Sequence, residues 1–229
     1  MNTEAIGKAA VEAVRLGDCP LPLADSIARG LLQIGAVVLR PNDLFTWSSG
    51  WKSPIYCDNR LILSYPTLRD QVLRGFEAVM REYFAGTDLV AGTATAGIPH
   101  AAMLADRLGL RMGYVRSSAK GHGMQKRVEG RVYPGATAVV VEDTLSTGAS
   151  AYDAVAALQA DGVHVLGVLS VFSYDFEAVK KRVQETGVQA YRLVDYDALL
   201  RAAVALGAVS AADENGLRAW REHPESYGQ

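Results

Sequence analysis

ATAVVVEDTLSTGAS, residues 136–150, is the stretch of sequence that decides the fold of this chain. The β-branched residues of Ala138–Val141 predict a buried strand that ends at two adjacent acids, Glu142 and Asp143. A loop of small hydroxyl residues and glycine follows, and then a helical pattern begins. A strand, a loop and a helix in this order are typical of a parallel α/β sheet, in which ligands bind at the carboxyl ends of the strands.

The acids and the loop together predict a site for a sugar phosphate. The start of the following helix offers free backbone N–H groups and the positive end of a helix dipole, and both suit a phosphate. The carboxylates of Glu142 and Asp143 are suited to accept hydrogen bonds from sugar hydroxyls. Taken alone, the motif also fits a plain strand end with an ordinary helix cap.

Composition narrows the class of protein. The chain has 229 residues, of which 49% are hydrophobic and 21% charged, which is typical of one soluble α/β domain with some additions. The net charge of −2 argues against nucleic acid or a membrane surface as a partner. Cys19 and Cys57 suggest no disulfide framework and fit a reducing, cytoplasmic location. We find no apolar run long enough to span a bilayer and no signal peptide.

The chain divides by pattern into an N-terminal quarter and an α/β core. The first 65 residues predict helices at 4–16 and 23–34 and an antiparallel, hairpin-like region at 36–59, which together form a small hood. Strands and helices alternate in the core, residues 66–206, which includes a mobile lid at 117–130. Residues 207–229 predict a C-terminal helix packed on the same domain.

The alternation in the core predicts a mostly parallel sheet with helices on both faces. Pro66 suits the first turn of a helix, and Ser210 is expected to cap the last one. We expect strands at 88–92, 111–115, 137–141, 163–172 and 191–194, and helices at 67–84, 98–108, 149–160, 176–185, 196–205 and 211–222.

Three further stretches carry chemistry. GTATAGIPHA, residues 92–101, is a strand-to-helix turn of small residues that allows backbone N–H groups to approach an anion, although such turns are common. YVRSSAKGHGMQKRVEGR, residues 114–131, carries five cations against one acid in a protein that is acidic overall, and a solvated loop is its alternative interpretation. FTWSSGWKSPIYCDNR, residues 45–60, also fits a plain β-hairpin with a solvated Lys52.

These four motifs, in this order, resemble the signatures of the orotate phosphoribosyltransferases, which are type I phosphoribosyltransferases. The resemblance runs from the second helix to the last strand. It implies the type I phosphoribosyltransferase fold and transfer of ribose 5-phosphate from phosphoribosyl pyrophosphate (PRPP) to orotate, giving orotidine 5′-monophosphate and pyrophosphate in pyrimidine (UMP) biosynthesis. Arg116, Lys120, His122 and Gly123 match the spacing of the family's flexible loop. That loop reaches into the neighbouring subunit's site, so a homodimer is also implied.

The resemblance implies a role for each part of the site. Orotate would be bound by Ser48, Ser49, Lys52, Tyr56, Ser146 and Tyr174. The implied catalytic residues are Arg116, Lys120, His122 and Asp143. The residues implied to bind PRPP are Thr95, Ala96, Gly97, Arg116, Lys120, His122, Glu142, Asp143, Thr144, Leu145, Ser146, Thr147, Gly148, Ala149 and Ser150.

Mg²⁺ is the implied cofactor. It prefers oxygen ligands and keeps several waters, so we expect it to bridge oxygens of PRPP without a dedicated protein cage, with Asp143 as a candidate ligand through a water.

The chain also departs from the family pattern. Ser48, Ala96, Ser117 and Tyr174 stand where many members carry a lysine or an arginine. The orotate carboxylate is left with backbone N–H groups, Ser146 or Lys52 as candidate partners, and the sequence does not choose among them. A different nucleobase phosphoribosyltransferase and a PRPP-sensing regulator without transfer activity are the alternative functions.

Overall fold

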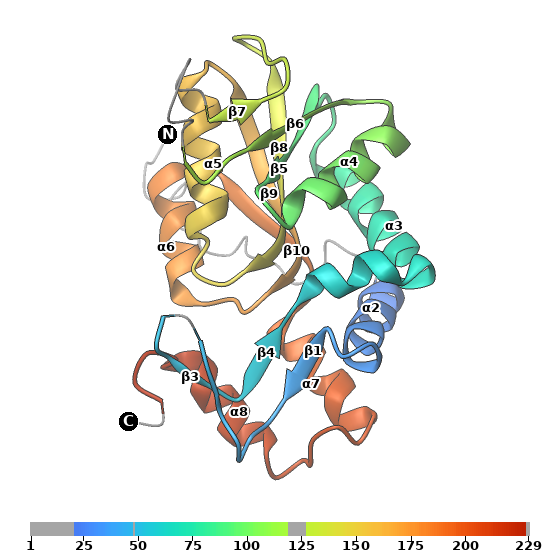
Figure 1. The fold of residues 1–229 in the computed structure, drawn as a ribbon, viewed down its shortest axis with the longest axis vertical. Helices are drawn as coiled ribbons and strands as arrows, with labels where there is room; N and C mark the ends of the chain where they lie inside the picture. Colours follow the sequence, from blue (N-terminus) through green and yellow to red (C-terminus); the bar gives the residue numbers. More distant parts are fainter. Residues whose placement is uncertain (1–20, 48, 119–126, 228–229) are drawn as a thin grey trace, which may run out of the picture.

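The structure is a computed structural model that describes residues 21–47, 49–118 and 127–227. The predicted helix at 4–16 lies outside these residues. Figure 1 shows a central sheet between two layers of helices, with the small strands of the hood and the C-terminal helices at one end of the molecule. Within the described residues, no helix has both the length and the apolar character needed to cross a bilayer.

The main sheet confirms the predicted α/β class. Within the described chain it has six strands, and all neighbouring pairs are parallel except the last pair, β6 and β7. In spatial order the strands are β10 (Gln189–Asp195), β9 (His164–Ser173), β8 (Thr137–Leu145), β5 (Leu89–Thr93), β6 (Arg111–Val115) and β7 (Val128–Glu129). Strand β7 shortens the loop that we predicted over 117–130.

Strand β8 lies near the middle of the sheet and is buried on both faces. Val139 and Val141 pack into the core on one face, and Ala138 and Val140 into the core on the other. This double burial explains why the strand is an unbroken apolar run.

Strand β8 is also longer than predicted, so the expected end at Val141 was wrong. It continues to Leu145, because strand β9 extends alongside it and pairs Glu142 with Ser170 and Leu145 with Ser173. The two acids therefore lie within a hydrogen-bonded strand, which holds their backbone more firmly than a loop would.

Helices cover both faces of the sheet. On one face lie α3 (Pro66–Tyr83) and α4 (Gly97–Leu108), and on the other lie α5 (Ala149–Ala160) and α6 (Glu177–Thr186) (Figure 1). Pro66 occupies the first turn of α3, as predicted. Gly109 ends α4 with a left-handed backbone, a conformation that glycine adopts without steric cost.

The hood consists of short antiparallel strands, as the sequence indicated. Strand β1 (Val37–Leu39) pairs with β4 (Ile55–Cys57), and β2 (Phe45–Thr46) pairs with β3 (Lys52–Ser53). Helix α2 (Leu21–Gln33) precedes these strands, and the 3₁₀ helix η1 (Asn59–Ser64) leads from them to α3.

Two helices end the chain, α7 (Tyr196–Ala205) and α8 (Glu214–Glu222). The prediction that the last helix starts at residue 211 with Ser210 as its cap was wrong. Ser210 Oγ donates to Asp213 Oδ2 at 2.6 Å, and this bond belongs to a turn that precedes α8.

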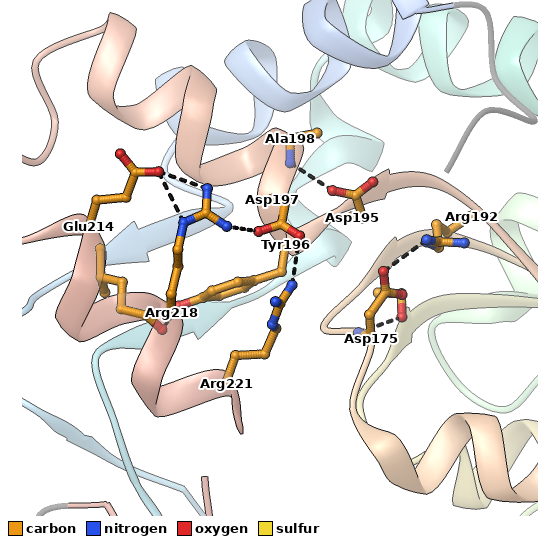
Figure 2. Close-up of polar contacts among 11 residues, drawn as sticks. Asp175, Arg192, Asp195, Tyr196, Asp197, Ala198, Glu214, Arg218 and Arg221 are labelled. Carbon is orange, nitrogen blue, oxygen red and sulfur yellow. Dashed lines mark hydrogen bonds and ion pairs between the residues drawn. The ribbon is translucent and has the colours of Figure 1, made fainter. Parts of the chain in front are cut away.

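Helix α8 connects to both α7 and the hood. Arg218 and Arg221 of α8 donate to the Asp197 carboxylate on α7 (Figure 2). Trp220 Nε1 donates to the Lys52 carbonyl at 3.0 Å, which joins α8 to the hood.

The domain boundaries at residues 65 and 206 stay a prediction.

Candidate active site

Glu142 and Asp143 form the centre of the candidate site. Glu142 is only 5% exposed, and its Oε2 accepts a hydrogen bond from Ser150 Oγ at 2.9 Å. Its Oε1 accepts from the Asp143 backbone N–H at 3.1 Å. Burial, followed by the neighbouring Asp143 charge, raises the pKa of Glu142 to about 7. A ligand that donates hydrogen bonds to this buried carboxyl would therefore stabilise its charged form.

The loop after β8 leaves the start of α5 open for an anion. Gly148 precedes the helix with φ of +73°, and no side chain caps the first turn. Arg182 Nε on α6 donates to the Thr147 carbonyl at 2.9 Å and fixes the loop from outside. The first-turn N–H groups of a helix have no partner within the helix, so this end can bind a phosphate.

A pocket of about 540 Å³ lies between the hood and this loop. Trp47 and Trp51 stack with ring centroids 6.2 Å apart, and Trp47 meets Tyr174 at 5.3 Å. Within the described residues no charged side chain lines the pocket, which suits a flat ring. Its lining residues are Thr46, Trp47, Ser49, Trp51, Tyr56, Cys57, Thr144, Ser146, Thr147 and Tyr174. We call this space the aromatic pocket.

Lys52 and the Asp175–Arg192 ion pair lie next to residues that line the aromatic pocket. Lys52 Nζ donates to Thr46 Oγ1 at 2.8 Å, which places the ammonium next to a lining residue but outside the lining itself. After Tyr174, Asp175 adopts φ of +56° and pairs with the buried Arg192 at 2.9 Å (Figure 2). This ion pair holds the turn that presents the Tyr174 ring.

A second, smaller pocket of about 140 Å³ lies beside Ser150. Arg116 Nη1 is buried there without a hydrogen-bond partner among the described residues, 3.7 Å from Glu129 Oε1. Arg127 Nε donates to the Arg116 carbonyl at 3.1 Å. Two guanidinium groups beside one small space suit an anionic group. The lining residues of this arginine pocket are Thr93, Ala94, Val115, Arg116, Ser117, Arg127, Ser150, Asp153 and Ala154.

The GTATAGIPHA turn packs closely against β8. A Cβ atom on Gly97 would lie 2.3 Å from the Val141 carbonyl oxygen and 2.5 Å from Thr93 Oγ1, so only glycine fits. Thr93 Oγ1 in turn donates to the Val141 carbonyl at 3.2 Å. Thr95 and Ala96 follow at the end of β5, and the Ala94–Thr95 peptide bond is cis.

The structure brings together many, but not all, of the residues predicted for the site. Ser49, Tyr56, Thr144, Ser146, Thr147 and Tyr174 line the aromatic pocket, and Arg116 and Ser150 line the arginine pocket. The Leu145 side chain is buried in the core, which leaves only its backbone for a ligand. Ser48, Lys120 and His122 lie outside the described residues.

Sequence reasoning missed several residues at the site. Trp47, Trp51 and Cys57 line the aromatic pocket, and Arg127 lines the arginine pocket. Asn59 is fully buried, and its Nδ2 donates to the Asp143 carbonyl at 3.0 Å. The aromatic residues of the hood motif signalled a ring-binding surface, but nothing near Asn59 in the sequence signals a contact with Asp143.

Comparison with known proteins identifies the family. A family model described as the phosphoribosyl transferase domain matches residues 61–190. The chain is 51% identical over 198 residues to an orotate phosphoribosyltransferase of Bacillus cereus, an alignment that covers 86% of this chain and 94% of that protein.

Solved structures agree with this result. An orotate phosphoribosyltransferase from Aeropyrum pernix superposes with a TM-score of 0.70 at 32% identity, covering 80% of this chain and 99% of that one. The Leishmania donovani UMP synthase superposes with a TM-score of 0.75 at 26% identity, covering 86% of this chain and 42% of that one. With its fold, its acid pair and its relatives in agreement, this chain belongs to the orotate phosphoribosyltransferase family.

Proposed function

We propose that this protein transfers ribose 5-phosphate from PRPP to N1 of orotate and so produces orotidine 5′-monophosphate and pyrophosphate for UMP biosynthesis. The observation that carries the proposal is the position of the acid pair. Glu142 bonds to Ser150, which lines the arginine pocket, while Asp143 bonds to Thr144, which lines the aromatic pocket. The acids therefore lie between a space for a base and a space for an anion.

The reaction breaks the bond between C1′ of the ribose and pyrophosphate, whose oxygen keeps the electron pair, and forms a bond from N1 of orotate to C1′. Positive charge develops on the sugar ring while negative charge grows on pyrophosphate. Orotate is an anion at neutral pH through its carboxylate, and the proton on its N1 passes to the departing pyrophosphate or to solvent as the N1–C1′ bond forms. Catalysis then consists of placing both reactants and stabilising the separated charges.

The chain's own groups suit these tasks. Glu142 and Asp143 accept hydrogen bonds from the ribose hydroxyls and favour positive charge on the ring. The 5′-phosphate binds at the start of α5, where Ser146, Thr147 and Gly148 form the loop. Arg116 stabilises the leaving pyrophosphate, and the rings of the aromatic pocket hold the base.

Mg²⁺ fits this site as a substrate-bound ion. Within the part of the chain that the structure describes, no group of three or more metal-ligating side chains occurs, and Glu142 and Asp143 are the carboxylates at the centre of the site. Mg²⁺ is commonly held by one or two carboxylates together with substrate phosphates and waters. Asp143 would hold it through a water, and the bound ion would neutralise charge on pyrophosphate.

The lid and the dimer are part of the same proposal. Lys120 and His122 would come from a lid of the neighbouring subunit and would help to neutralise pyrophosphate. Loss of one charged contact of this kind lowers kcat on the order of 10²–10³. Lys120→Ala should therefore lower kcat strongly while the far-UV spectrum stays unchanged, and a kcat within about threefold of wild type would contradict the lid assignment.

Mixing subunits tests the dimer. Lys120→Ala and Glu142→Gln proteins, each with little activity, should regain activity when mixed, because one of the two sites then holds both wild-type residues. No recovery in a dimer that exchanges subunits would contradict a shared site.

A cytoplasmic location is also proposed, from the low number of cysteines.

A substrate panel tests the proposed reaction. We expect orotate absorbance to fall when PRPP is added with Mg²⁺, and pyrophosphate to appear in equal amount. Uracil, hypoxanthine and adenine should not be consumed. Turnover of a purine would favour a different phosphoribosyltransferase, and PRPP binding without any turnover would favour a regulator.

A further inference from the structure

Thr144 occupies a junction that the proposed reaction does not yet explain. Its hydroxyl lies 2.9 Å from Asn59 Nδ2, 3.3 Å from Asp143 Oδ2 and 3.8 Å from Cys57 Sγ. Asn59 and Cys57 belong to the end of the hood, more than eighty residues before Thr144 in the chain (sequence separations of 85 and 87). The Thr144 hydroxyl thus contacts both the hood and the acid pair, and Asn59 also donates directly to the Asp143 carbonyl.

The direction of each hydrogen bond follows from the chemistry of the groups. The Asp143 carbonyl can only accept, so the side of the Asn59 amide that faces it must be the NH₂ group, which also faces Thr144. A threonine hydroxyl has one proton and two lone pairs. With one lone pair taken by Asn59, the proton is free to point at the Asp143 carboxylate, which only accepts when charged.

The third partner completes the set. Burial raises the pKa of Cys57 to about 12, so the sulfur carries its proton at neutral pH and can donate weakly to the second lone pair of Thr144. All three bonding positions of the hydroxyl oxygen are then used in one consistent arrangement. The hydroxyl cannot rotate without losing at least one of these bonds.

We propose that Asn59 and Thr144 are positioning residues that hold the Asp143 carboxylate in the orientation needed to bind the ribose. Asn59 fixes the Thr144 hydroxyl, and the hydroxyl fixes the carboxylate. Cys57 and Thr144 also line the aromatic pocket, so the same set joins the base site to the sugar site. This inference rests on the proposed function, because its readout is the transfer reaction.

The buried amide of Asn59 is only partly satisfied by hydrogen bonds. Its Oδ1 is buried without a hydrogen-bond partner among the described residues. An unsatisfied buried acceptor destabilises a fold, and an apolar group of similar shape removes that penalty. Asn59→Leu removes the unpartnered Oδ1 together with the donor to the Asp143 carbonyl and Thr144 Oγ1, so its thermal unfolding midpoint is measured alongside its kinetics.

The test is a double-mutant cycle on kcat/KM for PRPP. We expect Thr144→Val and Asn59→Leu each to lower kcat/KM about tenfold. The double variant should also show a total loss of about tenfold, and not about a hundredfold, because both residues act through one carboxylate. Thr144→Ser keeps the hydroxyl and should stay within about threefold of wild type. The loss should appear mainly in the rate of the transfer step, which is measured with saturating orotate.

Strand β8 offers a matched control at its other end. Thr137 Oγ1 lies 2.9 Å from the Asp88 carboxylate, a contact of the same kind far from the acids. Thr137→Val should change the thermal unfolding midpoint but leave kcat/KM unchanged. An equal loss of kcat/KM in Thr137→Val and Thr144→Val would reveal general loosening of the strand and would overturn the inference.

Two further outcomes would also overturn it. One is Thr144→Val with kcat/KM within about threefold of wild type, and the other is a double variant whose loss is the product of the single losses. Failure of the wild-type protein to consume orotate with PRPP would contradict the proposed function itself. Failure of the inference is therefore distinguishable from failure of the proposed function.

Discussion

The aromatic pocket and the arginine pocket differ in size, charge and origin. The first has a volume of about 540 Å³, is lined by rings and hydroxyls, and is formed largely by the hood. The second has a volume of about 140 Å³, holds two arginines and is formed by the core of the sheet. In the proposed reaction the first pocket would recognise the base and the second would stabilise the leaving group, with Glu142 and Asp143 between them.

Removal of an arginine from the smaller pocket should have the largest effect. Arg116→Ala is expected to lower kcat on the order of 10²–10³ with little change in the KM for orotate, because negative charge grows on pyrophosphate as the bond breaks. Arg131→Ala is the control, since Arg131 is exposed and stacks on Tyr133 at 5.2 Å. Equal losses in both variants would contradict a specific role for the arginine pocket.

The acid between the pockets should make stability depend on pH. The pKa of Glu142 rises from 4.5 to about 7 on folding, so between these values the folded protein binds a proton that the unfolded chain has lost. Stability from this group is complete below pH 4.5 and falls as pH rises to about 7. Each unit of pKa difference corresponds to about 1.4 kcal/mol.

Glu142→Gln should remove this dependence. The variant should match wild type in free energy of unfolding near pH 4.5, exceed it above about pH 7, and lose transfer activity. Urea unfolding at several pH values measures the difference. A gap between the two proteins that does not change with pH would show that Glu142 titrates normally.

Loss of a ring from the larger pocket should have a smaller and different effect. Tyr56→Ala is expected to raise the KM for orotate about tenfold, since stacking of a base on an aromatic ring contributes about 1–3 kcal/mol. The KM for PRPP should not change. Tyr65 is equally exposed, at 44% against 43%, but does not line the pocket, so Tyr65→Ala serves as the control.

The smallest effect concerns the charge near the rim of the aromatic pocket. Lys52→Met is expected to raise the KM for orotate about threefold at low salt and less at high salt, because an exposed charge is screened. Binding of uracil, which lacks the carboxylate, should not respond. A salt-independent change in the KM for orotate would assign the carboxylate to backbone N–H groups or to Ser146.

The sequence predicted the parts of the site that depend on local pattern. The acid pair, the glycine at position 97 and the open start of α5 each follow from a few neighbouring residues, as do the short strands of the hood. Family resemblance supplied the expectation that these parts meet.

The missed features depend on contacts between distant segments. The end of β8 is set by pairing with β9, and the role of Asn59 depends on a contact across 84 residues. Asn59 also follows Asp58 in a polar stretch, where nothing predicts that it is fully buried. The start of α8 was misplaced because Ser210 binds the Asp213 side chain, a choice that spacing alone does not reveal.

A crystal structure with PRPP, Mg²⁺ and an unreactive orotate analogue tests the central claim most directly. We predict the ribose hydroxyls within hydrogen-bonding distance of Glu142 and Asp143, the pyrophosphate beside Arg116, and the ring of the analogue beside Tyr56 and Tyr174. Pyrophosphate bound in the aromatic pocket, or a ribose that contacts neither acid, would contradict the account.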